Sequence, residues 1–190
     1  MKKLIAIPVL AVVLSSFTLL NSIWKNDPPH SQLGFTVTHL GINDVSGTFN
    51  DFEVSINAQK ADFSDAVFTL TAKTASVDTR VEARDNHLKS ADFFDAAQYP
   101  EFSFTSTSIK SAGKNKFKLT GNLTLHGVTK EVSLDALYRG TVENPMSKKQ
   151  TAGFSVTGTI KRSDFQIGSK FPDAMVSDLV QIKADGEFAQ

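Results

Sequence analysis

Hydrophobic and polar residues alternate along most of this chain, and eight stretches alternate almost without error. The clearest of them cover residues 117–125, 154–160 and 180–188. A period of two is that of a β-strand with one buried and one solvated face. We therefore predict eight strands, over residues 32–40, 44–58, 65–77, 102–110, 115–126, 129–142, 150–162 and 178–189. In the second strand Phe49 and Phe52 interrupt the alternation, which a bulge between them would restore.

Eight strands with short connections leave few ways to avoid exposed sheet edges. An open sheet of this size presents unpaired backbone groups along two edge strands, whereas closure into a barrel pairs every strand. The expected fold class is therefore all-β, an eight-stranded antiparallel barrel. Such a barrel is either filled by its own side chains or wide enough for one small ligand, so its interior is the first place to look for function.

Two connections are long, and they separate the third strand from the fourth and the seventh from the eighth. Within residues 78–101, Val81–Leu88 is compatible with a helix, Ser90 is a candidate cap, and Pro100 would end the segment. If consecutive strands are antiparallel neighbours, residues 78–101 and 163–178 lie at the same rim. The first of these two connections is thus expected to form a short helical lid over a ligand entrance.

The side of each strand that faces the barrel interior follows from the same alternation. The inward positions are almost all apolar: Phe35, Val37, Phe68, Leu70, Phe102, Phe104, Leu119, Leu123, Phe154, Val156 and Ile160. The alternation does not distinguish a filled barrel from a hollow one. Fifteen phenylalanines, against two tyrosines and one tryptophan, favour a dry interior.

Two polar residues continue the inward series at the lid rim, and they are His39 and Arg162. A buried arginine needs an acid, a carbonyl, water or a ligand head group as its partner. We expect Arg162 to bind a head group, with an ion pair to Asp164 or Asp178 as the alternative.

Arg84 and His87 of the lid are further candidates for contact with a head group. Arg84 and Asp85 also suit a salt bridge or loop tie, and Arg80 and Arg84 would share one helix face if the helix included both. The two phenylalanines of residues 92–95 are expected to hold the lid on the barrel.

The same residues give little support to metal binding or catalysis. The three rim histidines, His39, His87 and His126, come from different segments without a His-x-His pair, and His126 has outward parity, so no metal is expected. The chain has no cysteine, and no inward serine or aspartate is placed beside His39. No catalytic residue is therefore expected; an isomerase or hydrolase using His39 with Arg162 is the alternative, and a stress-related structural protein is a third.

The first 22 residues differ from the rest of the chain. Lys2 and Lys3 precede an apolar run over residues 4–14 and a softer serine- and threonine-containing region, as in a secretory signal. No A-x-A cleavage site precedes Trp24, so an uncleaved anchor is the alternative. Residues 23–190 form one expected domain, in which residues 24–31 are an extended lead-in. A formal net charge of zero argues against a nucleic-acid partner.

Several motifs resemble those of the YceI family of exported bacterial proteins. They are Asp27-Pro-Pro-His-Ser31, Phe35-Thr-Val-Thr-His-Leu-Gly41, Val45-Ser-Gly-Thr-Phe49, Val77-Asp-Thr-Arg80, Arg84–Asp95, Leu119–Lys130 and Lys161-Arg-Ser-Asp-Phe165. The resemblance implies a lipocalin-like barrel whose apolar tunnel holds an isoprenoid or similar amphiphilic lipid with its head toward an opening. It also implies a periplasmic location, no cofactor, no established reaction and homodimers in some members. Transient contact with a membrane is a further expectation.

Overall fold

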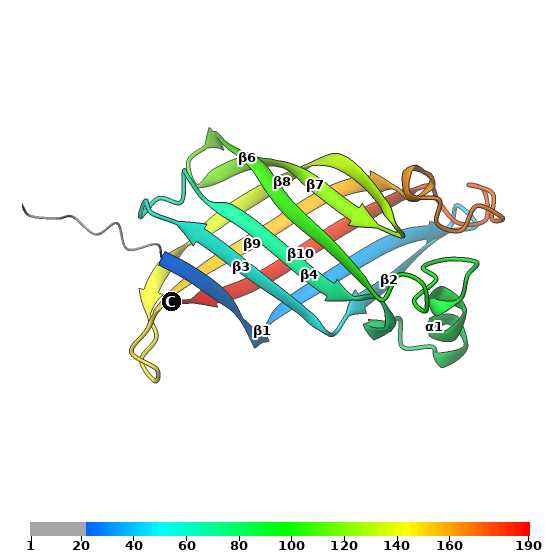
Figure 1. Ribbon diagram of the computed structural model, residues 1–190, viewed down its shortest axis with the longest axis horizontal. Helices are drawn as coiled ribbons and strands as arrows, with labels where there is room; N and C mark the ends of the chain where they lie inside the picture. The colour runs from blue at the N-terminus through cyan, green and yellow to red at the C-terminus, as the bar shows by residue number, and fades with distance from the viewer. Residues whose placement is uncertain (1–21) are drawn as a thin grey trace, which may run out of the picture.

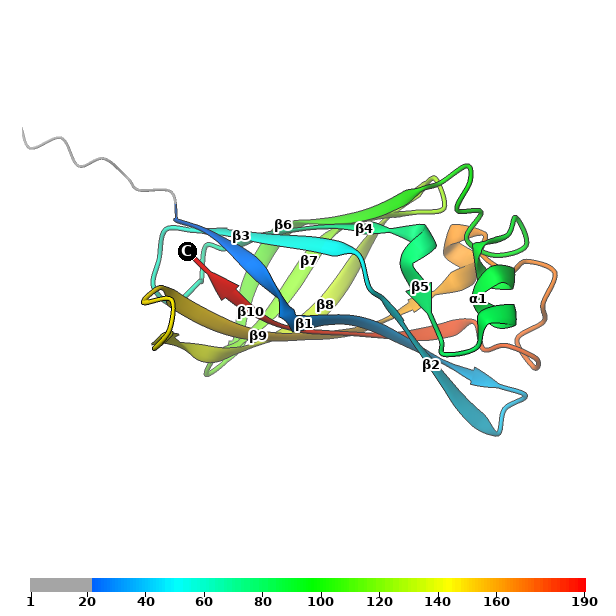
Figure 2. The same cartoon turned by 90° about the horizontal axis from the view of Figure 1, so that it is seen from below.

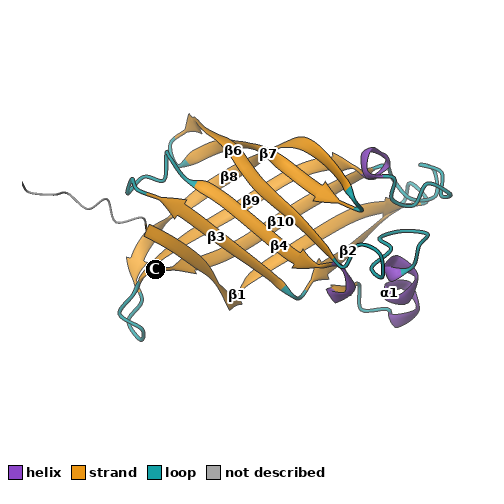
Figure 3. Cartoon of the chain, viewed as in Figure 1, coloured by secondary structure: helices purple, strands orange, loops and turns teal. Residues whose placement is uncertain are grey.

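The computed structural model describes residues 22–190, so the predicted signal segment lies outside the described residues except at its last position. The described chain is built mainly of antiparallel strands with one short α-helix (Figure 3). No helix in this part of the chain is long and apolar enough to cross a membrane.

The strands form one closed barrel, as the alternation predicted. Pairing follows the order β10-β9-β8-β7-β6-β4-β3-β1, and an additional ladder between β10 and β1 closes the ring (Figure 1). The bounds are β1 Ser22–His39, β3 Phe52–Ala58, β4 Val67–Lys73, β6 Glu101–Gly113, β7 Lys116–Leu125, β8 Val128–Glu143, β9 Gln150–Lys161 and β10 Leu179–Ala189.

The first strand is longer than the sequence indicated. Residues 24–31, expected to be a lead-in, belong to β1: Ser22–Lys25 pair with β3, and Lys25 and Asn26 pair with β10. The alternation of apolar and polar residues is lost here because the β1–β10 ladder has a bulge between Asn26 and Ser31, and this bulge contains two prolines. The strand is therefore fixed by partners distant in sequence.

The predicted second and third strands are each divided. The second consists of β2 (Asn43–Phe49) and β3, which are separated by a bend where a single bulge was expected. The third ends at Lys73 and is followed by the 3₁₀ helix η1 (Thr74–Ser76) and the two-residue strand β5 (Val77–Asp78), which pairs with β2. The chain thus leaves the barrel four residues earlier than predicted.

The long connections meet at one end of the barrel, as expected. Helix α1 (Glu82–Lys89), the β1–β2 hairpin and the loop after β9 lie together at the end opposite the C-terminus (Figure 2). The helical lid between the predicted third and fourth strands is confirmed. Arg80 precedes this helix and has a φ of 64°, so the shared helix face predicted for Arg80 and Arg84 is wrong.

Two clusters of apolar side chains occupy the two ends of the barrel. The cluster away from the lid contains Trp24 and Phe63 beside Phe154 of β9. Phe63 lies in the loop between β3 and β4, only 2% exposed, and its ring centroid is 5.3 Å from that of Trp24 and 5.0 Å from that of Phe154. The second cluster joins the lid to the strands through Phe49, Phe93 and Phe102, among others.

Trp24 tests whether the first residues of β1 are part of the barrel. We expect Trp24→Ala to lower the free energy of unfolding by about 3–5 kcal/mol, because it leaves a cavity beside Phe63. Ile23→Ala is the matched control, since the neighbouring Ile23 is 51% exposed and its truncation should have little effect. Equal stability of the two variants in chemical denaturation would show that this segment is only a lead-in.

Candidate functional site

The barrel encloses a cavity of about 570 Å³ between its filled end and the lid. That volume lies within the range of small-molecule sites, and the wall is predominantly apolar. All eleven apolar positions assigned to the interior line it: Phe35, Val37, Phe68, Leu70, Phe102, Phe104, Leu119, Leu123, Phe154, Val156 and Ile160. The inward parity predicted for these residues is therefore confirmed.

The barrel is filled by side chains at one end and hollow toward the lid. Phe154 is 2% exposed and packs against Phe63, Phe68 and Tyr138, so the end away from the lid is filled. Phe35, on the lid side, is only partly buried and lies on the cavity wall. Phe63 was not assigned to the interior because it lies on a loop, where parity gives no signal.

Arg162 is buried at the lid rim and holds the loop that follows it. Its guanidinium makes five hydrogen bonds of 2.6–3.2 Å, donating to the backbone carbonyls of Ile167, Gly168, Phe171, Val176 and Ser177. The alternative, an ion pair to Asp164 or Asp178, is wrong: Asp178 instead accepts hydrogen bonds from the backbone N–H and hydroxyl of Ser163. Since the five donors of Arg162 are committed to carbonyls, none is left for a head group.

Arg84 and Asp85 form a tie between the lid helix and the segment before it. The Arg84 guanidinium donates to the Thr79 hydroxyl (2.7 Å) and carbonyl (2.8 Å). The Asp85 carboxylate accepts from the hydroxyl and the backbone N–H of Thr79, and the hydroxyl bond lowers the pKa of this carboxyl. The loop tie expected for Asp85 is confirmed, and Arg84 joins it while also lining the cavity.

The lid contacts the loop after β9 through aromatic rings and one ion pair. The rings of Phe93 and Phe171 stack with centroids 4.8 Å apart, and His87 lies edge-on to both. Beside them Lys170 Nζ lies 2.5 Å from Asp92 Oδ1, and this hydrogen bond lowers the pKa of Asp92. The two long connections therefore close over the cavity together.

The two phenylalanines of the lid have different partners. Phe94 packs on the barrel against the rings of Phe35 and Phe49, which is the contact that the sequence predicted for both lid phenylalanines. Phe93 is buried but stacks on Phe171 of the opposite loop. Phe94 thus attaches the lid to the barrel, and Phe93 attaches it to the neighbouring loop within the cluster that also contains Phe49 and Phe102.

The three rim histidines have different partners. His39 is exposed, lines the cavity mouth and forms a bridge with Val176. The ring of His126 lies against Tyr99, and its Nδ1 is 3.1 Å from the carbonyl oxygen of Phe165. His87, 3.5 Å from Asp92, has its own partner in the lid.

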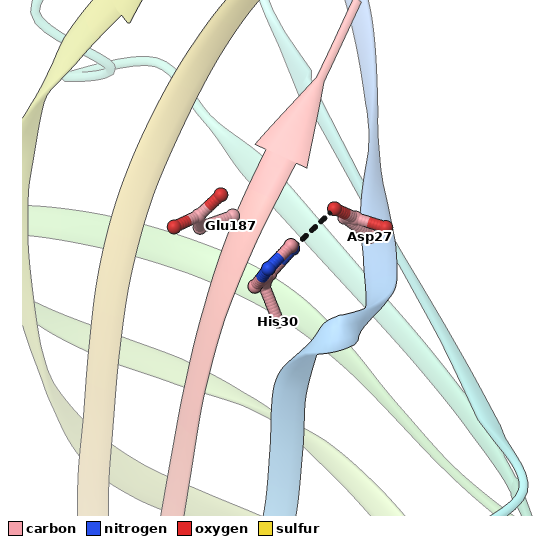
Figure 4. Close-up of side chains that lie close together, drawn as sticks. All are labelled: Asp27, His30 and Glu187. Atoms are coloured by element: carbon pink, nitrogen blue, oxygen red, sulfur yellow. Dashed lines mark hydrogen bonds and ion pairs between the residues drawn. The ribbon is translucent and has the colours of Figure 1, made fainter. Parts of the chain in front are cut away.

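A cluster of possible metal ligands lies on the other side of the barrel wall. Asp27, His30 and Glu187 place one potential ligand atom each within 4.8 Å of one another (Figure 4). His30 Nδ1 is 2.7 Å from Asp27 Oδ2, and this hydrogen bond raises the pKa of the imidazole. Sequence reasoning overlooked His30 because it considered only the histidines at the lid rim.

Comparison with known proteins places this architecture in a family. The profile of the YceI-like domain matches residues 24–188. A UPF0312 protein of Photorhabdus laumondii is 37% identical over 182 residues, covering 94% of each chain. A UPF0312 protein of Staphylococcus aureus is 36% identical over 162 residues, covering 85% of this chain and 91% of its own.

Solved structures show the same fold. The Campylobacter jejuni YceI protein has a TM-score of 0.74 at 35% identity, covering 80% of this chain and 89% of its own. Burkholderia cenocepacia BcnA has a TM-score of 0.75 at 27% identity, covering 85% and 98%. A polyisoprenoid-binding domain from Saccharophagus degradans has a TM-score of 0.64 at 15% identity, covering 89% and 98%, and that likeness shows the fold alone.

Arg162 is expected to stabilise the fold without selecting the ligand. Arg162→Met removes five hydrogen bonds and leaves buried carbonyls without donors, so we expect a loss of more than about 2 kcal/mol in the free energy of unfolding. Lys161→Met, at an exposed neighbouring position, is the control. Thermal unfolding beside a lipid profile checks this expectation; a normal melting temperature with altered head-group preference would contradict it.

The ion pair at the β1 bulge predicts a pH dependence. Because Asp27 raises the pKa of His30, the protonated imidazole is favoured in the folded state. Its stabilising effect should be fully present below the ordinary histidine pKa and be lost as pH rises through the raised folded value. Titration by NMR should show a raised pKa in the wild type and a lower one in Asp27→Asn, in which only Glu187 still raises it. Identical titration curves would disprove the pair.

Proposed function

This chain belongs to the YceI family, and we propose that it is an exported binding protein that holds an isoprenoid or similar amphiphilic lipid inside its barrel. The observation that carries the proposal is the apolar cavity of about 570 Å³, closed at one end by packed rings and covered at the other by a lid. A polar metabolite would lose its hydration in such a cavity without gaining hydrogen bonds, which costs free energy. A hydrocarbon chain is stabilised there because its apolar surface leaves water.

A solved structure with the same fold supports a lipid ligand. The Saccharophagus degradans domain is described as polyisoprenoid-binding, and it shares the barrel with this chain. An apolar lining on the same barrel suits a ligand of that class. The binding role proposed here rests on the lining of this cavity.

The tail should contribute more to affinity than the head group does. Each buried methylene is worth about 0.8 kcal/mol, and a hydrogen bond to a charged group nets about 1.5–3 kcal/mol. About four methylenes therefore outweigh one head-group contact. Chain length should set affinity, and polar contacts should set preference among lipids of equal length.

The positions of His39 and Arg162, the two candidate catalytic residues, favour binding over catalysis. Arg162 has its donors on backbone carbonyls, and His39 is exposed at the mouth beside Val176. An isomerase or hydrolase using His39 with Arg162 would need both side chains free to face its substrate. The proposed role is therefore carriage or storage of the lipid.

Export and membrane contact complete the proposal. Export to the periplasm rests on the charged start and apolar run of residues 1–22. Membrane contact is supported by exposed apolar side chains around the lid end, namely Leu40, Ile42, Val81, Met175 and Leu179. Such a rim suits transient contact with a lipid surface from which a ligand is taken. Homodimer formation stays a prediction.

Extraction of the purified native protein tests the proposed function. We expect organic solvent to release one amphiphilic lipid per chain, identified by mass spectrometry. An empty protein that converts a prenyl diphosphate would instead favour an enzyme. Absence of both lipid and turnover would favour the structural role.

Leu119 provides a test of where the tail lies. Leu119 is 1% exposed and lines the cavity near its filled end, so Leu119→Trp should shorten the longest chain bound. Overpacking should cost about 1–3 kcal/mol of stability. The control is Lys118→Trp, which adds the same ring at an exposed position. If the folded Leu119→Trp protein carries the same chain lengths as the control, the tail lies elsewhere.

A further inference from the structure

Part of the backbone ladder is missing along β1 between Lys25 and Leu33, on the side that faces β3 and β2, and we call this gap the seam. On its β3 and β2 side, β1 pairs up to Lys25 with Ser55 and resumes at Leu33 with Phe49. Between these points, the Asn26 side chain replaces a backbone group: its Oδ1 accepts the Val54 backbone N–H at 2.8 Å. This contact fixes the amide orientation, so the Asn26 donors point away from Val54.

The opposite edge of the same stretch carries a bulge. Five residue steps from Asn26 to Ser31 correspond to two steps of β10, from Phe188 to Gly186, which leaves three extra residues in β1. The bulge has the exposed Asp27–His30 pair on it, while Asn26 and Ser31 at its ends line the interior cavity. A second, outer cavity of about 290 Å³ shares Asn26 with the interior one.

Asn26 and Ser31 each have a buried polar atom without a hydrogen-bond partner in the described part of the chain. Among the described residues, Asn26 Nδ2 and Ser31 Oγ are the two buried side-chain polar atoms without a hydrogen-bond partner. Both residues line the interior cavity, and Gly186 lies beside Ser31, where a Cβ would come within 2.9 Å of the hydroxyl. Buried polar groups in native proteins are almost always paired, so two unpaired groups on residues of one cavity wall point to a missing partner.

We propose that Asn26 and Ser31 form a recognition site for an uncharged oxygen of the bound lipid, a carbonyl or hydroxyl group. The inference rests on the proposed function and says which polar group of the amphiphile is recognised and where. The amide N–H groups donate to that oxygen, and the Ser31 hydroxyl donates to it or accepts from it. The polar end of the lipid is thus held at the seam, away from the lid.

The distribution of charge favours a neutral group over a phosphate. Among the described residues that line the interior cavity there is no lysine, and the two arginines, Arg84 and Arg162, hold the lid and its neighbouring loop. Lys25 lines only the outer cavity. An anion at Asn26 would therefore be buried without a countercharge, which is costly, whereas a carbonyl needs only the donors present.

The test compares matched ligands on delipidated protein. Geranylgeranylacetone supplies a ketone, and its counterpart with a methylene in place of the carbonyl supplies the same tail without oxygen. Ser31→Ala removes one unpaired hydroxyl and breaks no hydrogen bond within residues 22–190, so it should fold with unchanged stability. Asn26→Asp keeps an acceptor for Val54 and replaces the amide donors. Ser133→Ala, at an exposed position of β8, is the control.

We expect each cavity variant to bind the ketone about threefold to tenfold more weakly than the control, with hydrocarbon affinity unchanged. Equal ketone affinity in all proteins, or equal loss for ketone and hydrocarbon, would overturn the site while leaving lipid binding intact. Tighter binding of geranylgeranyl diphosphate that depends on Ser31 would overturn the neutral-oxygen assignment. Failure of the wild type to bind either tail would overturn the proposed function, and this inference with it.

Discussion

The position of β1 between three other strands is the constraint on which the rest of the structure depends. One edge of β1 pairs with β10 over residues 25–26 and 31–36, while its other edge pairs first with β3 and later with β2. This arrangement closes the barrel, and closure removes the edges that eight strands would otherwise expose. Because β2 and β3 are divided by a bend, β1 cannot have an uninterrupted ladder on that edge. The seam and its bulge are therefore products of closure.

Closure also separates a filled half from a hollow half. Phe63 enters from the loop after β3 and packs with Trp24 and Phe154, which fills the end away from the lid. At the other end, polar side chains hold the two connections that cover the cavity. Arg162 donates hydrogen bonds to the loop after β9, and Thr79 is hydrogen-bonded to the lid helix. The apolar residues between these ends face inward and line the cavity.

Alternation predicted the parts of this fold that local pattern determines. Strands β7, β9 and β10 were placed within one residue at each end, and the inward parity of the apolar positions named on β7 and β9 is confirmed. The start of β1 was missed because its pairing depends on distant partners and its prolines break the pattern. The partners of Arg162 were missed because five loop carbonyls carry no sequence signal. Asn26 was missed because parity has no meaning within a bulge.

The central claim is that the hollow half of the barrel holds a lipid chain. A high-resolution crystal structure of the protein, purified without any delipidation, tests it most directly. We predict one continuous, elongated density between the ring of Phe104 and the lid, bordered by the apolar wall and reaching Asn26 and Ser31. A cavity filled by rotated side chains of the wall, or one that holds only separate water molecules, would contradict the account.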